Sequence, residues 1–134
     1  MLIFALVFTS AAAAQDAPDA GISALSEDAR AALEKRGKRL FLRCRSCHSL
    51  KQAERHRTGP NLNGLIGADA GAKDTYQYSD AVKASGIVWN EGTLDAWLQS
   101  PAALIPGNRM VFAGLRKPQD RQALIAYLIA STAE

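Results

Sequence analysis

The motif Cys44-Arg45-Ser46-Cys47-His48 constrains this chain more than any other stretch. On a helical turn, residues at i, i+3 and i+4 share one face, so the thiols and the imidazole are expected to lie together. Thiols at this spacing can add to the vinyl groups along one edge of a haem, and the adjacent imidazole can then ligate the iron. Cys-x-x-Cys-His is the attachment signature of c-type haem. The motif therefore predicts one haem c, bound covalently through Cys44 and Cys47 with His48 on its iron.

Other chemistries use a Cys-x-x-Cys pair, namely a redox dithiol, a structural disulfide or half of a zinc site. A zinc site needs about four ligands. The chain has two cysteines and two histidines, and His56 lies outside the usual zinc spacing. A thioredoxin-like dithiol would follow a strand and open a helix, whereas this pair closes a basic helical pattern. The sequence favours haem attachment over these alternatives.

The N-terminal residues differ from the rest of the chain. Residues 1–14 are uncharged, mostly apolar and end in alanines, which is typical of a secretory signal peptide cut before Gln15. No Lys or Arg precedes this run, so an uncleaved anchor is the alternative. Residues 15–25 are small and polar and predict a flexible leader, and residues 26–134 predict a single domain. Haem c is attached on the far side of the energy-transducing membrane, so we expect a periplasmic protein.

Helical patterns begin near four signals. Ser26 precedes the first apolar repeat, Ser79 can cap a short helix that ends before Gly86, and Asn90 can cap another. Pro118 suits the first position of a last helix. No strand-rich stretch or internal repeat is present, so the sequence predicts an all-α fold.

The stretches between these helices are long. Residues 49–78 are rich in glycine and polar residues, the helix after Asn90 is expected to stop at Pro101, and residues 102–115 read as irregular. Loops of this length usually need something to pack on. A haem would provide that surface.

Met110 is the candidate ligand for the opposite face of the iron. It is the only methionine besides the initiator, and it follows a Pro106-Gly107 turn rather than lying on a helical stripe. A thioether in such a loop can reach an iron. Two alternatives remain at this point: Met110 could fill a gap in the core, or His56 could ligate the iron. His56 is only eight residues past His48, so it more readily braces a loop.

Basic residues flank both candidate ligands. The first cluster precedes and surrounds the cysteines, and the second lies around Met110. These clusters are Arg36, Lys38, Arg39, Arg43 and Arg45, and Arg109, Arg116 and Lys117. A solvated charged face is one interpretation, and a docking surface for acidic patches on redox partners is the other. Basic arms that bind nucleic acid are usually longer, so no nucleic-acid partner is expected.

From Gly37 to the C-terminus the chain resembles a class I cytochrome c of the mitochondrial type. The resemblance covers nearly a hundred residues. The matching stretches, in the family's order, are Gly37–Phe41, the Cys-x-x-Cys-His motif, Thr58–Gly64, Tyr76–Ala81, Gly86–Trp89, Pro106–Gly114 and Leu124–Leu128.

The resemblance implies a fold and a set of residue roles. The fold would be that of cytochrome c, with short helices and long loops wrapped around one haem. His48 and Met110 would be the axial ligands, and the carbonyl of Pro60 would orient His48. Tyr78 and Trp89 would hydrogen-bond a propionate.

Further roles follow from the same resemblance. Phe112 would shield the haem on the methionine side, Gly37 would be the close contact between the first and last helices, and His56 would brace the glycine-rich loop.

The sequence departs from the family pattern near the haem. Ala68 stands where an arginine commonly faces a propionate, Val82 where an asparagine is frequent, Trp97 where a tyrosine is usual and Asn108 where a threonine is usual. Without the arginine's charge, Fe(III) should be favoured, so we expect a lower midpoint potential than in members that keep it. Ala68→Arg should then raise the potential.

The function implied is one-electron transfer. A soluble carrier, expected to be a monomer with no small-molecule substrate and no enzymatic activity, would shuttle electrons between membrane redox complexes. The alternatives are an anchored domain or subunit of a respiratory complex, and a haem protein that reacts with peroxide or gases if Met110 dissociates easily.

Overall fold

The structure is a computed structural model that describes residues 21–133. The predicted signal peptide (1–14) and the first part of the leader lie outside these residues. The elements, in chain order, are η1 (Ile22–Ala24), α1 (Glu27–Leu40), η2 (Phe41–Arg43), α2 (Asp80–Lys83), α3 (Glu91–Gln99), α4 (Pro101–Leu104) and α5 (Pro118–Thr132). Within residues 21–133 the sole β-type pairing is one isolated bridge, between Asp69 and Val88. The all-α prediction is confirmed.

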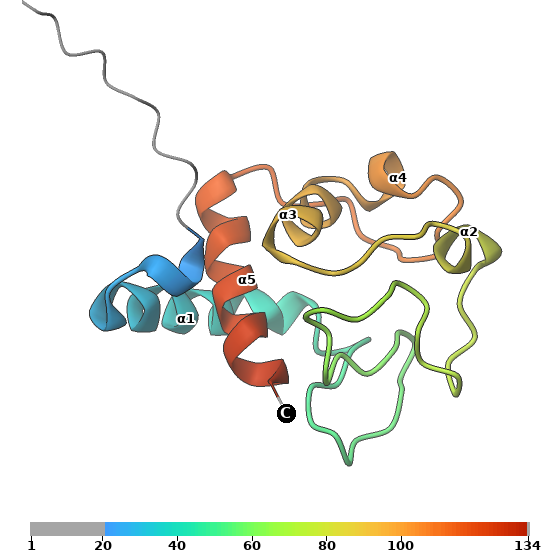
Figure 1. Cartoon of the computed structure of the whole chain (residues 1–134), viewed down its shortest axis with the longest axis horizontal. Helices are drawn as coiled ribbons and strands as arrows, with labels where there is room; N and C mark the ends of the chain where they lie inside the picture. Colours follow the sequence, from blue (N-terminus) through green and yellow to red (C-terminus); the bar gives the residue numbers. More distant parts are fainter. Residues whose placement is uncertain (1–20, 134) are drawn as a thin grey trace, which may run out of the picture.

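Helices α1 and α5 cross each other and form the most extensive helix contact in the described chain (Figure 1). A Cβ placed on Gly37 would lie 2.0 Å from the carbonyl oxygen of Ala123 and 2.6 Å from the Cβ of Tyr127. No side chain larger than hydrogen fits there without moving backbone. The predicted close contact of the first and last helices at Gly37 is therefore confirmed.

The predicted caps are also present. The side chain of Ser79 accepts a hydrogen bond from Val82 N at the start of α2, and Asn90 and Thr93 form a reciprocal capping box on α3. Pro118 occupies the first turn of α5. The prediction of irregular chain from residue 102 was wrong at its start, because α4 adds a single turn after Ser100.

The leader differs from the prediction at its C-terminal end. Ile22 is buried and belongs to the main apolar cluster. Its N–H donates to the Glu91 carboxylate at 2.9 and 3.2 Å. The end of the predicted flexible leader is therefore fixed to the first turn of α3 by a contact that spans 69 residues of sequence.

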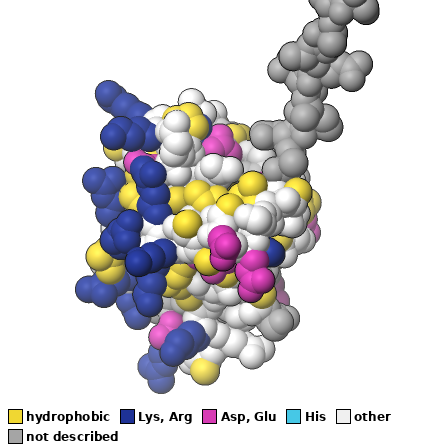
Figure 2. Space-filling view, turned by 90° about the vertical axis from the view of Figure 1, so that its left-hand side faces the viewer, with side chains coloured by type: hydrophobic (Ala, Val, Ile, Leu, Met, Phe, Trp, Pro, Cys, Tyr) yellow, Lys and Arg dark blue, Asp and Glu magenta, His cyan; other side chains and the backbone are white. Residues whose placement is uncertain are grey.

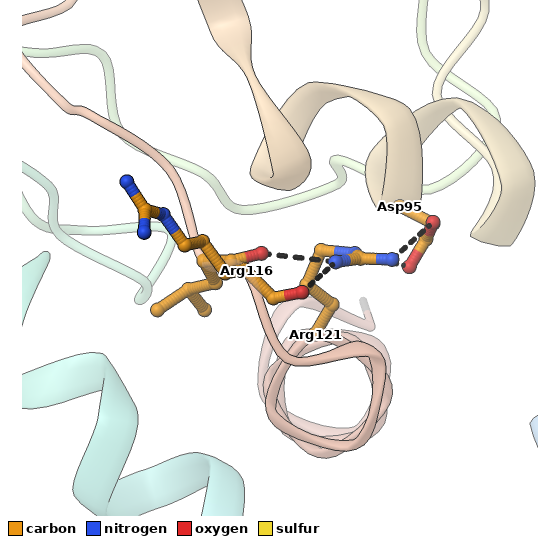
Figure 3. A network of polar contacts seen from close by, with 4 residues as sticks. Asp95, Arg116 and Arg121 are labelled. Atoms are coloured by element: carbon orange, nitrogen blue, oxygen red, sulfur yellow. Dashed lines mark hydrogen bonds and ion pairs between the residues drawn. The ribbon is translucent and has the colours of Figure 1, made fainter.

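Arg121 is a charged side chain in this apolar interior. Figure 3 shows its guanidinium between Asp95 of α3 and two backbone carbonyls. Nε and Nη2 donate to Asp95 at 2.7 and 3.2 Å, and Nη1 donates to the carbonyls of Leu115 and Arg116 at 2.9 and 3.1 Å. Each of the three guanidinium nitrogens thus donates at least one hydrogen bond, which permits the burial of this charged group. The contacts join α5 to α3 and to the end of the segment that carries Met110.

No helix within residues 21–133 has both the length and the apolar character needed to cross a bilayer.

Candidate haem-binding site

The attachment motif forms one helical turn directly after η2. Cys47 N and His48 N both donate to the carbonyl of Cys44, at 3.0 and 2.9 Å. The i+3 and i+4 residues therefore lie beside residue i, as the spacing predicts. Both thiols are free. Burial raises the pKa of Cys44, although the nearby Arg43 charge opposes that shift.

His48 is oriented by the chain that follows it. Its Nδ1 lies 2.8 Å from the carbonyl oxygen of Pro60, which confirms the predicted hydrogen bond. Because a carbonyl only accepts, Nδ1 carries the proton and Nε2 keeps its lone pair. Burial lowers the pKa of His48, so the imidazole is neutral at pH 7. A neutral imidazole with a free Nε2 is the form that binds a metal ion.

Gly59 makes room for this ring. A Cβ at Gly59 would lie 2.5 Å from Cε1 and 2.8 Å from Nδ1 of His48. Its N–H also donates to the carbonyl of Cys47 at 2.8 Å. The residue before Pro60 is therefore glycine for a steric reason.

A network centred on Asn61 supports the loop after His48. The buried Asn61 side chain donates to Ser49 Oγ at 2.9 Å and to the carbonyl of Lys51 at 2.8 Å. His56 contributes through both ring nitrogens, since Nδ1 accepts from Asn61 N and Nε2 lies 2.8 Å from Thr75 Oγ1. The prediction that His56 braces a loop is confirmed.

One cavity of about 410 Å³ opens beside the attachment turn. The residues singled out from the sequence all line it: Cys44, Cys47, His48, Pro60, Tyr78, Trp89, Met110 and Phe112. They come from five separate parts of the chain. Most of the remaining lining is apolar and includes Leu62, Leu94, Leu98, Leu124 and Leu128.

The cavity fits a haem by the chemistry of its donors. It offers two thiols for covalent bonds, an imidazole and a thioether for the iron, and apolar walls for the porphyrin. Its volume lies within the roughly 300–1,000 Å³ range of cofactor and ligand pockets. Among residues 21–133 no group of three or more His, Cys, Asp or Glu side chains could hold a metal ion. The described residues thus do not supply the ligand set of a zinc site.

The Met110 loop is held by the side chain of Asn108. Asn108 Oδ1 accepts from Met110 N, and Asn108 Nδ2 donates to the carbonyl of Ile105, each at 2.9 Å. Gly107 has φ +87°, which an L side chain rarely adopts. Arg109 donates to the carbonyl of Gln77. Asn108, a departure from the family pattern, therefore fixes the backbone that presents Met110.

Another part of the lining, which we call the Tyr78–Trp89 wall, consists of Ala68, Lys73, Tyr78 and Trp89. Trp89 N donates to the carbonyl of Ala68 at 2.9 Å, so the two are held side by side. Burial raises the pKa of Tyr78, against a smaller opposing effect of its hydrogen bond with the Lys73 backbone. Its phenol is therefore protonated at pH 7 and can donate a hydrogen bond.

The remaining departures also line the cavity. Val82 lies near Tyr78 in sequence, and Trp97 stacks edge-on against Trp89 with ring centroids 5.5 Å apart. Neither Ala68 nor Val82 can donate a side-chain hydrogen bond. The side-chain polar groups available on the Tyr78–Trp89 wall are therefore those of Lys73, Tyr78 and Trp89.

Three residues were not singled out from the sequence, namely Asn61, Lys73 and Arg121. Asn61 stands inside a matched motif, which was a usable signal. The partners of Lys73 and Arg121 come from other segments, and no local pattern identifies them.

Lysines and arginines gather along one edge of the face seen in Figure 2, and most of the acidic groups on this face lie further from that edge. The basic side chains named from the sequence around the cysteines and around Met110 are all exposed. Val111, next to Met110, is fully exposed at 102%.

Comparison with known proteins gives consistent matches. The family model for cytochrome c matches residues 34–131. The chain is 43% identical to cytochrome c2 of Rhodomicrobium vannielii over 93 residues, covering 69% of this chain and 74% of that protein. It is 48% identical to cytochrome c of Gossypium barbadense over 100 residues, covering 74% and 90%. Among solved structures, cytochrome cH from Methylobacterium extorquens aligns with TM-score 0.68 and 39% identity, over 72% of this chain and 97% of that one.

Proposed function

Since this chain belongs to the class I cytochrome c family and is an electron carrier with a c-type haem, we propose that His48 and Met110 are its axial ligands. We further propose that Cys44 and Cys47 form the thioether bonds. The observation that carries this proposal is the convergence of these four residues on one cavity. When bound, the haem iron supplies one-electron chemistry by alternating between Fe(III) and Fe(II).

The protein's own residues prepare the site for that chemistry. Pro60 keeps His48 in one orientation and one tautomer, at 2.8 Å from Nδ1. Asn108 fixes the backbone of Met110 through two hydrogen bonds. Because both residues that would hold the iron are braced, little would have to move between oxidation states. A neutral imidazole and a thioether favour the reduced iron and raise its potential.

The apolar lining would exclude water from the iron of a bound haem, and Phe112 would contribute to that lining on the methionine side. Tyr78 and Trp89 can each donate a hydrogen bond to a propionate. With His48 and Met110 both holding the iron, no position would remain for a substrate, so the role proposed is electron transfer without catalysis.

The carrier's partners are proposed to be redox proteins or membrane complexes with acidic patches. The exposed basic clusters and the asymmetry in Figure 2 support that choice of partner. The proposed location is the periplasm, with the chain acting as a monomer. An uncleaved N-terminal segment would make it an anchored carrier instead, and intact-mass analysis of purified protein distinguishes the two.

The test of the site is optical spectroscopy of protein made in a haem-attaching host. Denaturation in acid acetone should leave the haem on the polypeptide, and reduced protein should show a low-spin spectrum. The oxidised protein should show the iron–thioether charge-transfer band, and Met110→Ala should abolish it. A wild-type protein without covalent haem would contradict the proposal, and so would a charge-transfer band that survives in Met110→Ala.

A further inference from the structure

We propose that the ammonium group of Lys73 is the cation that pairs with a haem propionate at the Tyr78–Trp89 wall. This inference rests on the proposed haem site. It concerns a residue that was not singled out from the amino-acid sequence. It assigns a cofactor-binding role to a lysine in the segment between Ala68 and Tyr78.

The side chain of Lys73, a residue that lines the cavity, is anchored by a backbone carbonyl. Its Nζ donates to the carbonyl of Asn63 at 2.8 Å in a partly buried position, and the residue lines the cavity. An ammonium has three donors. Asn63 uses one of them, and among the ion pairs of the described residues none involves Lys73. Donors and charge therefore remain for a ligand.

The other charged groups around the cavity are less suited to this role. Arg43 lies beside Cys44, where the motif requires the thioether edge of the porphyrin, and Arg109 is committed to the carbonyl of Gln77. Asp69 also lines the cavity, but it carries negative charge and is exposed. Other titratable groups that line the cavity include Tyr76, Tyr78 and His48. Tyr76 donates to the carbonyl of Thr58, and His48 lies 2.8 Å from the carbonyl of Pro60. Among the four residues of the Tyr78–Trp89 wall, Lys73 is thus the one with a positive charge.

The physical need for such a cation is strong. Propionates are carboxylates, and a carboxylate at an apolar cavity is costly unless it is paired or hydrogen-bonded. The phenol of Tyr78 and the indole of Trp89 supply neutral donors but no charge. Ala68 lines the same wall and supplies neither. Lys73, in the middle of the 68–78 segment, therefore provides a charge that the Ala68 side chain does not.

The role has an electrochemical consequence. Fe(III) carries one more positive charge than Fe(II), so a nearby cation disfavours the oxidised form. Loss of the Lys73 charge should lower the midpoint potential. At an effective dielectric constant near 20, a charge some ten ångströms away changes the reduction equilibrium constant roughly ten- to twentyfold.

The test is spectroelectrochemical titration of holoprotein carrying Lys73→Met. We expect its reduction equilibrium constant, measured against a fixed reference couple, to fall roughly ten- to twentyfold. Lys73→Arg, which keeps the charge, should remain near wild type. Lys35→Met is the matched control, because it removes the same charge from an exposed position on α1 that does not line the cavity.

A second comparison separates the role of the charge from a structural role. Ala68→Arg should raise the midpoint potential more in the Lys73→Met background than in wild type. In that background the Tyr78–Trp89 wall has no other cation, so the arginine restores the missing charge. Equal potentials for Lys73→Met and Lys35→Met would overturn the inference, as would a failure of Lys73→Arg to preserve the wild-type potential. In those cases the optical spectrum would still show haem ligated by histidine and methionine, so the proposed function would stand. Wild-type protein without haem would overturn both.

Discussion

At the scale of single residues, the site depends on a few side chains held by short-range contacts. His48 is fixed by Pro60, and the space for its ring exists because residue 59 is glycine. Met110 is fixed by Asn108. Asn108 departs from the family pattern, yet it supplies both an acceptor and a donor to the loop. The substitution therefore keeps the Met110 backbone constrained.

Replacement of Met110 should open the iron to external ligands. In Met110→Ala the thioether is lost, and we expect the reduced protein to bind carbon monoxide rapidly at neutral pH, whereas wild type should bind it slowly. The measurement is the shift of the Soret band after mixing. Val111→Ala is the control, because Val111 is adjacent but fully exposed. Equally rapid binding by wild type would indicate a labile or absent Met110 bond and would favour a gas-reactive protein.

At the scale of elements, the crossing of α1 and α5 is the most demanding contact. Gly37→Ala places a methyl group against the Ala123 carbonyl, at a starting separation of 2.0 Å. We expect it to lower the free energy of unfolding by about 1–3 kcal/mol, the usual cost of overpacking. Guanidinium unfolding followed by circular dichroism measures the change.

The control for this prediction is Gly92→Ala on α3. Gly92 is exposed, and its nearest obstacle is Asn90 Oδ1 at 3.4 Å. This change should be neutral or add about 0.5 kcal/mol of stability, because alanine favours a helix over glycine. Similar stability for Gly37→Ala and wild type would show that the two helices can separate at no cost.

Arg121 should matter more than an ordinary surface cation. In Arg121→Met the carbonyls of Leu115 and Arg116 lose their donor, and the Asp95 carboxylate loses its partner. We expect a loss of about 2–3 kcal/mol in the free energy of unfolding, below the largest buried-pair values because the Asp95 side chain is 42% exposed.

Arg36→Met provides the comparison for Arg121. Its ion pair with Asp120 involves an arginine side chain that is 46% exposed, so its removal should cost less than about 1 kcal/mol. Urea unfolding of both variants gives the difference. If the two substitutions cost the same, the buried network does not stabilise the junction of α3 and α5.

The elements that the sequence predicted correctly are those with local signals. Ser79, Asn90 and Pro118 mark helix starts within a few residues of the helices themselves. The single turn of α4 was missed because Pro101, which begins it, was interpreted only as the end of the preceding helix, and because α4 contains only four residues. The fixed position of Ile22 was not predicted, because it depends on a hydrogen bond with Glu91, which is remote in sequence.

The site was predicted more completely than the contacts that support it. The residues proposed to ligate the iron and to form the thioether bonds belong to short motifs, and all of them line the cavity. The supporting residues Lys73 and Arg121 act through backbone carbonyls of other segments. Every residue has a carbonyl, so sequence carries no mark of which one a side chain will reach.

At the scale of the whole molecule, charge distribution matters more than net charge. The formal charge is +3, and two haem propionates would offset most of it. The exposed basic side chains nevertheless gather on one side, as Figure 2 shows. Such asymmetry orients a protein before contact with an acidic partner.

This orientation predicts salt-sensitive kinetics. The second-order rate of electron transfer with a partner that has an acidic patch should fall steeply as ionic strength rises, because the Debye length shrinks from about 30 Å at 0.01 M to about 8 Å at 0.15 M. Stopped-flow absorbance measures the rate. A small uncharged oxidant serves as the control and should show little change. A flat profile with the acidic partner would contradict steering.

The position of α5 in the cavity also has a consequence for how the protein matures. Leu124 and Leu128 of α5 complete a lining that begins with Phe41 and Cys44. In a chain that has not yet folded, α5 is not packed on α1, so both thiols lie outside any closed cavity. We expect an enzyme that joins porphyrin to protein to act on this open chain, and the last helix to pack over the product afterwards.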